Sequence, residues 1–192
     1  MAITNTHPQK DWLQRSARLM RAALIPLCLL ASPALAQDAA PGGPRADTSL
    51  IEACLENVSI AAEDGAPFPP SNCIGLAAKA CMEQPDGSST AGMVSCSTQE
   101  LEYWDKVLNT AYQELVIQSK AVDANAAEGQ PKQADRLRDM QRKWIAFRDA
   151  SCAWEIGQFP GGSIQGPVSA QCDLRLTAAQ ALRLQDLRTP ER

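Results

Sequence analysis

The stretch Gln141-Arg-Lys-Trp-Ile-Ala-Phe-Arg-Asp-Ala-Ser-Cys152 decides the fold of this chain. Within it and just before it, apolar side chains recur at the three- and four-residue spacing of an amphipathic helix. Pro131 suits the first turn of that helix. The apolar positions are Leu137, Met140, Trp144, Phe147 and Cys152, and the opposite face is basic: Lys132, Arg136, Arg138, Arg142 and Lys143. The pattern predicts one long helix that ends near Cys152.

A second long helix is predicted directly upstream. Ser97-Thr98-Gln99-Glu100 has the spacing of a capping box, which places the start of the helix at Ser97. A single apolar stripe follows: Leu101, Trp104, Leu108, Ala111, Tyr112 and Leu115. The polar segment 123–130 ends in Gly129, a helix stop. Two long helices joined by a short polar turn are expected to pack as an antiparallel hairpin.

Shorter helices are predicted on both sides of this hairpin. One covers about 49–62, and another runs from a cap at Ser71-Asn72 to Met82. A last helix from about Ser169 to Leu187 should bury Cys172, Leu176, Ala179 and Leu182. The segment 157–167 is too rich in glycine and proline for a regular element. Since strand patterning is nearly absent, the sequence predicts an all-α fold, a small disulfide-stapled domain of about five helices.

The N-terminus has the pattern of a secretory signal. Basic residues precede an apolar core, 22–35, that is too short to span a bilayer, and cleavage is expected after Ala36. Met20 is an alternative start to Met1, since it would leave a compact signal. Residues 37–48 are expected to form a disordered leader, and 49–192 a single helical domain. No later segment is apolar enough to cross a membrane.

The charge and the histidine content exclude several functions. Residues 37–192 carry 14 Lys and Arg against 21 Asp and Glu, a net charge of −7. This argues against nucleic acid and anionic membranes and permits a cationic partner. The one histidine, His7, lies in the signal segment. Without it, the exported chain has no Ser-His or Cys-His catalysis and lacks the commonest metal ligand.

Six cysteines remain after export: Cys54, Cys73, Cys81, Cys96, Cys152 and Cys172. An even number in an oxidising compartment indicates disulfides, and six cysteines allow 15 pairings. Sequential pairing is favoured, since each bridge would close a short loop worth about 3 kcal/mol. A metal site is disfavoured because there is no Cys-x-x-Cys spacing and no accompanying histidine. No metal or cofactor is expected.

These features together resemble a known family. With Cys96 and Trp104-Asp-Lys-Val-Leu-Asn-Thr-Ala-Tyr112 upstream and Cys172 downstream, the opening stretch is similar to the LprI-like family. These are small envelope domains named after a mycobacterial lysozyme inhibitor. The resemblance covers about 96–187 and implies a periplasmic or secreted domain that binds a protein, in particular a cationic lysozyme. The polar positions that match are Asp105, Asn109, Tyr112, Gln141, Trp144, Arg148 and Asp149. The chain departs from the family where Gln180 replaces the usual arginine.

Two interpretations of the matching polar cluster stay open. In an antiparallel hairpin, Asp105 and Arg148 could form a partly buried latch that fixes helix register. Alternatively, the cluster binds a ligand. Trp104 and Trp144 lie on apolar stripes and are expected in the core, whereas Trp154 lies beyond the stripe and should be exposed.

The loop between Cys152 and Cys172 is the preferred candidate for partner binding. It presents Phe159 and Ile164, next to Trp154, and a loop tethered at both ends loses less entropy on binding. Arg175 is a candidate to enter the acidic cleft of a lysozyme, and Arg183 or the basic face of the helix that ends near Cys152 are the alternatives. The chain is expected not to be an enzyme. The alternatives are an accessory or structural envelope protein with another partner, or a glycan hydrolase that uses carboxylates such as Asp105.

Overall fold

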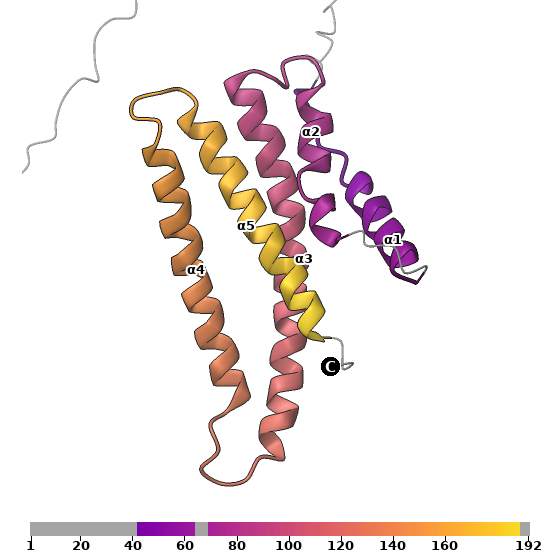
Figure 1. The fold of residues 1–192 in the computed structure, drawn as a ribbon, viewed down its shortest axis with the longest axis vertical. Coiled ribbons are helices and arrows are strands. Elements are labelled where there is room, and N and C mark those ends of the chain that lie inside the picture. Colours follow the sequence, from indigo (N-terminus) through magenta and orange to yellow (C-terminus); the bar gives the residue numbers. More distant parts are fainter. Residues whose placement is uncertain (1–41, 64–68, 189–192) are drawn as a thin grey trace, which may run out of the picture. The chain divides into compact units, whose positions relative to one another are not determined.

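The computed structural model describes residues 42–63 and 69–188. The expected signal segment, its cleavage site near Ala36 and the first residues of the expected leader lie outside these ranges. The described chain is all-helical, as predicted, and no strand occurs in it. Its elements are α1 (Ser49–Glu63), the 3-10 helix η1 (Pro70–Cys73), α2 (Leu76–Met82), α3 (Thr90–Ala124), α4 (Gln133–Gly157) and α5 (Gln165–Arg188) (Figure 1).

The hairpin of α3 and α4 is present, and α5 completes a three-helix arrangement. In Figure 1, α4 runs antiparallel to α3, while α5 returns alongside α3 in the same direction. The most extensive packing joins α3 to α5, and α4 contacts both of them less extensively. These two helices therefore bury their facing side chains in one core cluster. Its members include Trp104, Leu108 and Ala111 of α3 and Ala178, Ala181 and Leu184 of α5. None of the helices in the ranges 42–63 and 69–188 has the combination of length and apolar character that a membrane-spanning segment needs.

Helix α3 starts eight residues earlier than the capping-box pattern predicted, comparing N-cap with N-cap. Ser89 is its N-cap, and the Ser89 hydroxyl accepts a hydrogen bond from the Gly92 amide at 3.0 Å. Ser97 is fully buried inside the helix. The capping-box prediction was wrong because Glu100 caps α2 and not its own helix. Gly92 is required here, because a Cβ on it would lie 2.1 Å from the carbonyl oxygen of Asp86.

Glu100 is fully buried and holds the N-terminus of α2 against α3. Its carboxylate accepts hydrogen bonds from the backbone amides of Gly75 at 2.6 Å and Ala78 at 2.7 Å. Trp104 donates its indole N–H to the same carboxylate at 3.0 Å. Free amides at a helix N-terminus favour a negative charge. The predicted cap at Ser71-Asn72 is therefore wrong: these residues lie in η1, and α2 begins after Gly75.

The three disulfides follow the sequential order. They join Cys54 to Cys73, Cys81 to Cys96, and Cys152 to Cys172. The first bridge ties α1 to η1, and the second ties α2 to α3. The third joins α4 to α5 next to their connecting loop.

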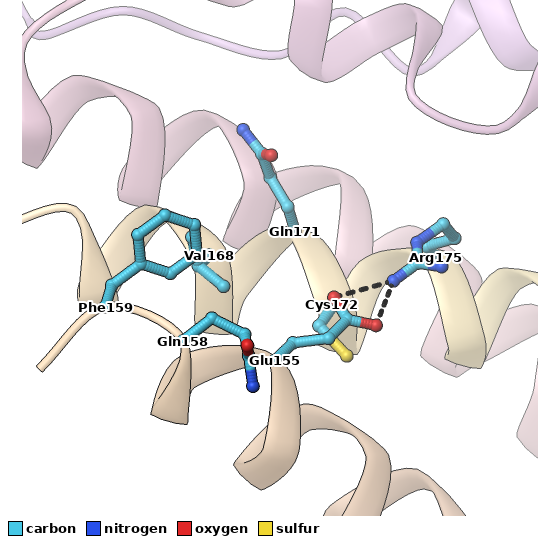
Figure 2. A pocket seen from close by; sticks show the side chains of 7 residues that line it. All are labelled: Glu155, Gln158, Phe159, Val168, Gln171, Cys172 and Arg175. Carbon is cyan, nitrogen blue, oxygen red and sulfur yellow. Dashed lines mark hydrogen bonds and ion pairs between the residues drawn. The ribbon is translucent and has the colours of Figure 1, made fainter.

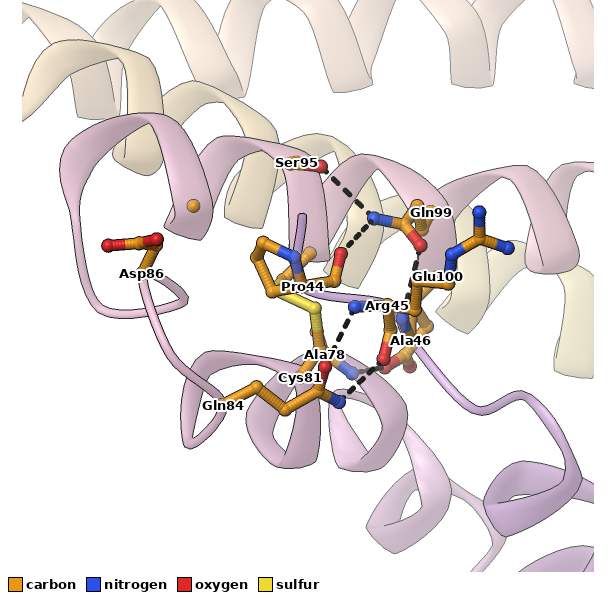
Figure 3. Close-up of a disulfide and its surroundings, with 12 residues drawn as sticks. Pro44, Arg45, Ala46, Ala78, Cys81, Gln84, Asp86, Ser95, Gln99 and Glu100 are labelled. Carbon is orange, nitrogen blue, oxygen red and sulfur yellow. Dashed lines mark hydrogen bonds between the residues drawn. A yellow bond between two sulfur atoms is a disulfide. The ribbon is translucent and has the colours of Figure 1, made fainter. Parts of the chain in front are cut away.

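The segment before α1 packs beside the second disulfide. Figure 3 shows Gln99 donating to the carbonyl of Pro44 at 3.1 Å, while its own amide oxygen accepts from the Ala46 amide at 3.1 Å. Gln84 exchanges two hydrogen bonds with the backbone of Arg45. The described part of the expected leader is thus held by side-chain amides. Disorder stays a prediction only for residues 37–41, which are not described.

Two apolar stripes differ from the predicted ones. Phe147 is 60% exposed, because the inner face of α4 runs through Leu137, Trp144 and Cys152 and leaves Phe147 at its outer side. On α5, Ala179 is exposed and the core positions are Ala170, Leu174, Thr177, Ala178, Ala181 and Leu184. Cys172 misled the prediction for α5, since its disulfide faces α4 and not the α3 core.

Candidate functional site

The loop between α4 and α5 is short and internally hydrogen bonded. Its backbone makes successive turns, with the Gly162 amide donating to Phe159 at 3.3 Å and the Gln165 amide donating to Gly162 at 3.2 Å. Gly161 has φ of 73°, a left-handed conformation that favours glycine. The loop is shorter than predicted, since α5 begins at Gln165 and takes Pro167 into its first turn. Together with the adjacent disulfide, these bonds restrain the loop at both ends.

Apolar side chains remain exposed on and beside this loop. Trp154 is 69% exposed, Phe159 43% and Ile164 39%. Phe147 lies seven residues before Trp154, and a spacing of seven keeps two side chains on one face of a helix. Trp154 and Phe147 line one shallow depression on the outer face of α4. The loop and the end of α4 therefore present several large apolar groups to solvent.

A hollow of about 280 Å³ lies between the end of α4 and the start of α5. Figure 2 shows Phe159 on one side of it and the Arg175–Glu155 pair on the other, above the sulfur of Cys172. One guanidinium nitrogen of Arg175 lies 2.7 and 2.9 Å from the two carboxylate oxygens of Glu155. Arg175 is thus already paired within the chain. A pair this exposed contributes at most about 1 kcal/mol, so a partner carboxylate can compete for it.

The polar residues that match the family do not form the expected latch. Asp105 is exposed and accepts a hydrogen bond from Asn109 at 2.8 Å. Arg148 pairs instead with its neighbour Asp149 at 2.8 Å, and its guanidinium lies over the Trp144 ring at 5.2 Å. Adjacent partners and the aromatic face satisfy each group locally, so no Asp105–Arg148 pair is needed.

The other matching residues are structural in their contacts. Tyr112 is half-buried against the hydrophobic core. Gln180, at the position where the family usually has arginine, is 4% exposed and donates to the side chain of Gln141 at 3.1 Å. This hydrogen bond links α5 to α4. Gln180 therefore makes an uncharged contact between the two helices at the position where the family usually has arginine.

An acidic groove runs between α3, α4 and α5, with a volume of about 630 Å³. We call it the acidic groove because four carboxylates line it against two cations. The carboxylates are Glu102, Asp105, Asp149 and Asp173, and the cations are Lys106 and Arg148. In the described residues, no three acidic groups converge as a metal site.

Asp173 of this groove carried no signal that singled it out in the sequence, whereas Thr177 matches the threonine that the family typically has after Cys172. Burial raises the pKa of Asp173, an effect that Arg148 opposes and Asp149 reinforces. Thr177, one turn further along α5, is 1% exposed, and its hydroxyl has no hydrogen-bond partner among the described residues. The four-residue spacing of Asp173 and Thr177 places them on one helical face, but only the packing of three helices shows that this face is a groove.

The comparison with protein families decides the classification. The family described as lysozyme inhibitor LprI matches residues 81–184, more than half of the chain. The chain belongs to the lysozyme inhibitor LprI family. The match begins at Cys81, so the family region includes the second disulfide as well as α3, α4 and most of α5. The resemblance predicted from the sequence is confirmed.

Two curated relatives are similar over most of their own length. One is an uncharacterized 17.7 kDa protein in the puhA 5' region of Rhodobacter capsulatus, 25% identical over 84% of this chain and 95% of that protein. The other is an uncharacterized protein of Rhizobium meliloti (strain 1021), 26% identical over 60% of this chain and 87% of that protein. No solved structure matches the chain. The disulfides and the family together indicate an extracellular or periplasmic protein.

Proposed function

We propose that the chain is an exported inhibitor that binds a cationic lysozyme through the end of the α4–α5 hairpin. The observation that carries the proposal is the restrained loop, which exposes Phe159 and Ile164 and follows the exposed Trp154 at the end of α4. Aromatic residues in such positions are typical binding anchors. A loop already ordered by turns and a disulfide pays little entropy to enter a concave site.

Charge supports the same partner. With the signal segment removed, the chain has a net charge of −7, which would steer a cationic protein toward it. Lysozymes are commonly cationic and have an acidic catalytic cleft. Arg175 stands at the edge of the loop-side hollow, where a carboxylate of that cleft would exchange with Glu155. Signal cleavage near Ala36 would place the inhibitor where lysozymes act.

The test is a titration of the oxidised chain, without residues 1–36, against chicken-type, goose-type and invertebrate-type lysozymes in a cell-wall clearing assay. We expect stoichiometric inhibition of one type, and a loss of at least tenfold in affinity for Phe159→Ala and Trp154→Ala. Ile117→Ala is the matched control, because Ile117 is 68% exposed but lies on α3.

Other outcomes would replace the proposal. Absence of inhibition for all three types, with binding to other envelope proteins, would indicate an accessory or structural envelope role. Turnover of peptidoglycan fragments that disappears in a folded Asp105→Asn variant would indicate a glycan hydrolase.

A further inference from the structure

The acidic groove is built by three helices and is separate from the loop. Glu102 and Asp105 come from α3, Asp149 from α4, and Asp173 from α5. Since Lys106 and Arg148 offset only two of these charges, the groove keeps an excess of negative charge. Arg148 is further occupied by Asp149 and by the Trp144 ring.

A second observation concerns Thr177, which lines the groove. Its hydroxyl is buried without a hydrogen-bond partner among the described residues. A buried polar atom left unpaired costs about 1–3 kcal/mol, so such atoms need an explanation. Asp173 stands one turn before it, half-buried, and feels the charges of Arg148 and Asp149. Within the described residues, a buried hydroxyl without a partner and a half-buried carboxylate therefore lie one turn apart on α5.

We infer that the acidic groove binds an arginine side chain of the partner protein, with Asp173 and Asp149 receiving the guanidinium above Thr177. A guanidinium presents five N–H donors in a planar fork and suits carboxylates that approach from more than one side. Such charge-assisted bonds are the stronger class of hydrogen bond. A compact metal ion fits less well, because the acidic groups of the described chain are spread along the groove.

This inference rests on the proposed cationic partner, but it uses residues outside the loop. The first experiment therefore needs no lysozyme. The oxidised chain is titrated with N-acetyl-arginine methylamide, and backbone amide shifts are followed by NMR. The citrulline analogue, which has nearly the same shape but no charge, is the control ligand. We expect saturable shifts at Asp173 and Thr177 with the arginine compound alone, and their loss in Asp173→Asn.

The protein control is Glu56→Gln, which makes the same change of charge on α1, a helix that contacts η1 and α2. It should leave the arginine shifts unchanged. Equal shifts with citrulline, or none up to about 50 mM arginine compound, would overturn the inference. Against an inhibited lysozyme, Asp173→Asn should weaken binding about tenfold. If only the loop variants weaken it, the inference fails and the proposed function stands.

Discussion

The buried carboxylate of Glu100 is the contact whose removal the structure predicts most sharply. Glu100→Ala removes one acceptor from three donors: the amides of Gly75 and Ala78 and the indole N–H of Trp104. The Ala78 and Trp104 bonds are buried, so water does not readily replace the lost oxygen atoms. The variant therefore leaves unpaired donors as well as a cavity.

The expected cost follows from these contacts. A hydrogen bond to a charged acceptor contributes about 1.5–3 kcal/mol, but three bonds to one group are not additive. Each buried donor left without an acceptor costs about 1–3 kcal/mol, and the deleted side chain leaves a cavity as well. We expect Glu100→Ala to lower the free energy of unfolding by about 2–5 kcal/mol. The Cys81–Cys96 bridge still ties α2 to α3, so α2 should loosen without leaving α3.

The assay is urea denaturation of the oxidised chain, combined with hydrogen exchange at the Gly75 and Ala78 amides. Glu102→Ala is the matched control, two residues along the same helix and exposed; it should change stability by less than about 0.5 kcal/mol. Both amides should exchange faster in the Glu100 variant alone. A Glu100→Ala protein within 1 kcal/mol of the wild type, with unchanged exchange, would refute the reasoning.

Two further predictions concern single side chains. Gly92→Ala should lower stability by about 1–3 kcal/mol in a thermal melt, because its Cβ would overlap the backbone of Asp86 and Gly87. Gly157→Ala, whose Cβ meets no atom within 4 Å, should be neutral or slightly stabilising; equal effects would contradict this. Burial raises the pKa of Asp173 in the folded chain above its value in the unfolded chain. The ionised side chain therefore opposes folding, and the free energy of unfolding falls as the pH rises above the pKa of the unfolded chain. Asp173→Asn should therefore gain less than about 1 kcal/mol at pH 7 and nothing near pH 3; a loss at pH 7 would contradict the sign.

The fold was predictable where local spacing determines it. The α3 stripe through Trp104, Leu108 and Ala111 is buried as its period indicated. Helix beginnings were less predictable, because a cap can come from a distant residue. Glu100 caps α2 instead of its own helix, and Asp123, at the end of α3, accepts the Gln133 amide at the start of α4 at 2.6 Å. Such contacts depend on packing, which a local pattern does not contain.

The candidate site was likewise predictable only where the local sequence determines it. Exposure of Trp154 followed from its place beyond the α4 stripe, and the loop followed from its glycines and prolines. The Arg175–Glu155 pair and the acidic groove did not follow, since each joins residues from different helices. The expected Asp105–Arg148 latch used the correct helices, but Arg148 has a nearer partner in Asp149. Spacing along one helix does not show which carboxylate, that of Asp105 or that of Asp149, pairs with Arg148.

The measurement that tests the central claim most directly is calorimetric titration of the oxidised chain, without residues 1–36, into each type of lysozyme. The account predicts a one-to-one complex with one type, weakened at least tenfold by Phe159→Ala and unaffected by Ile117→Ala. Absence of heat with every lysozyme, or a complex that both variants leave unchanged, would contradict the claim that the restrained loop binds a lysozyme.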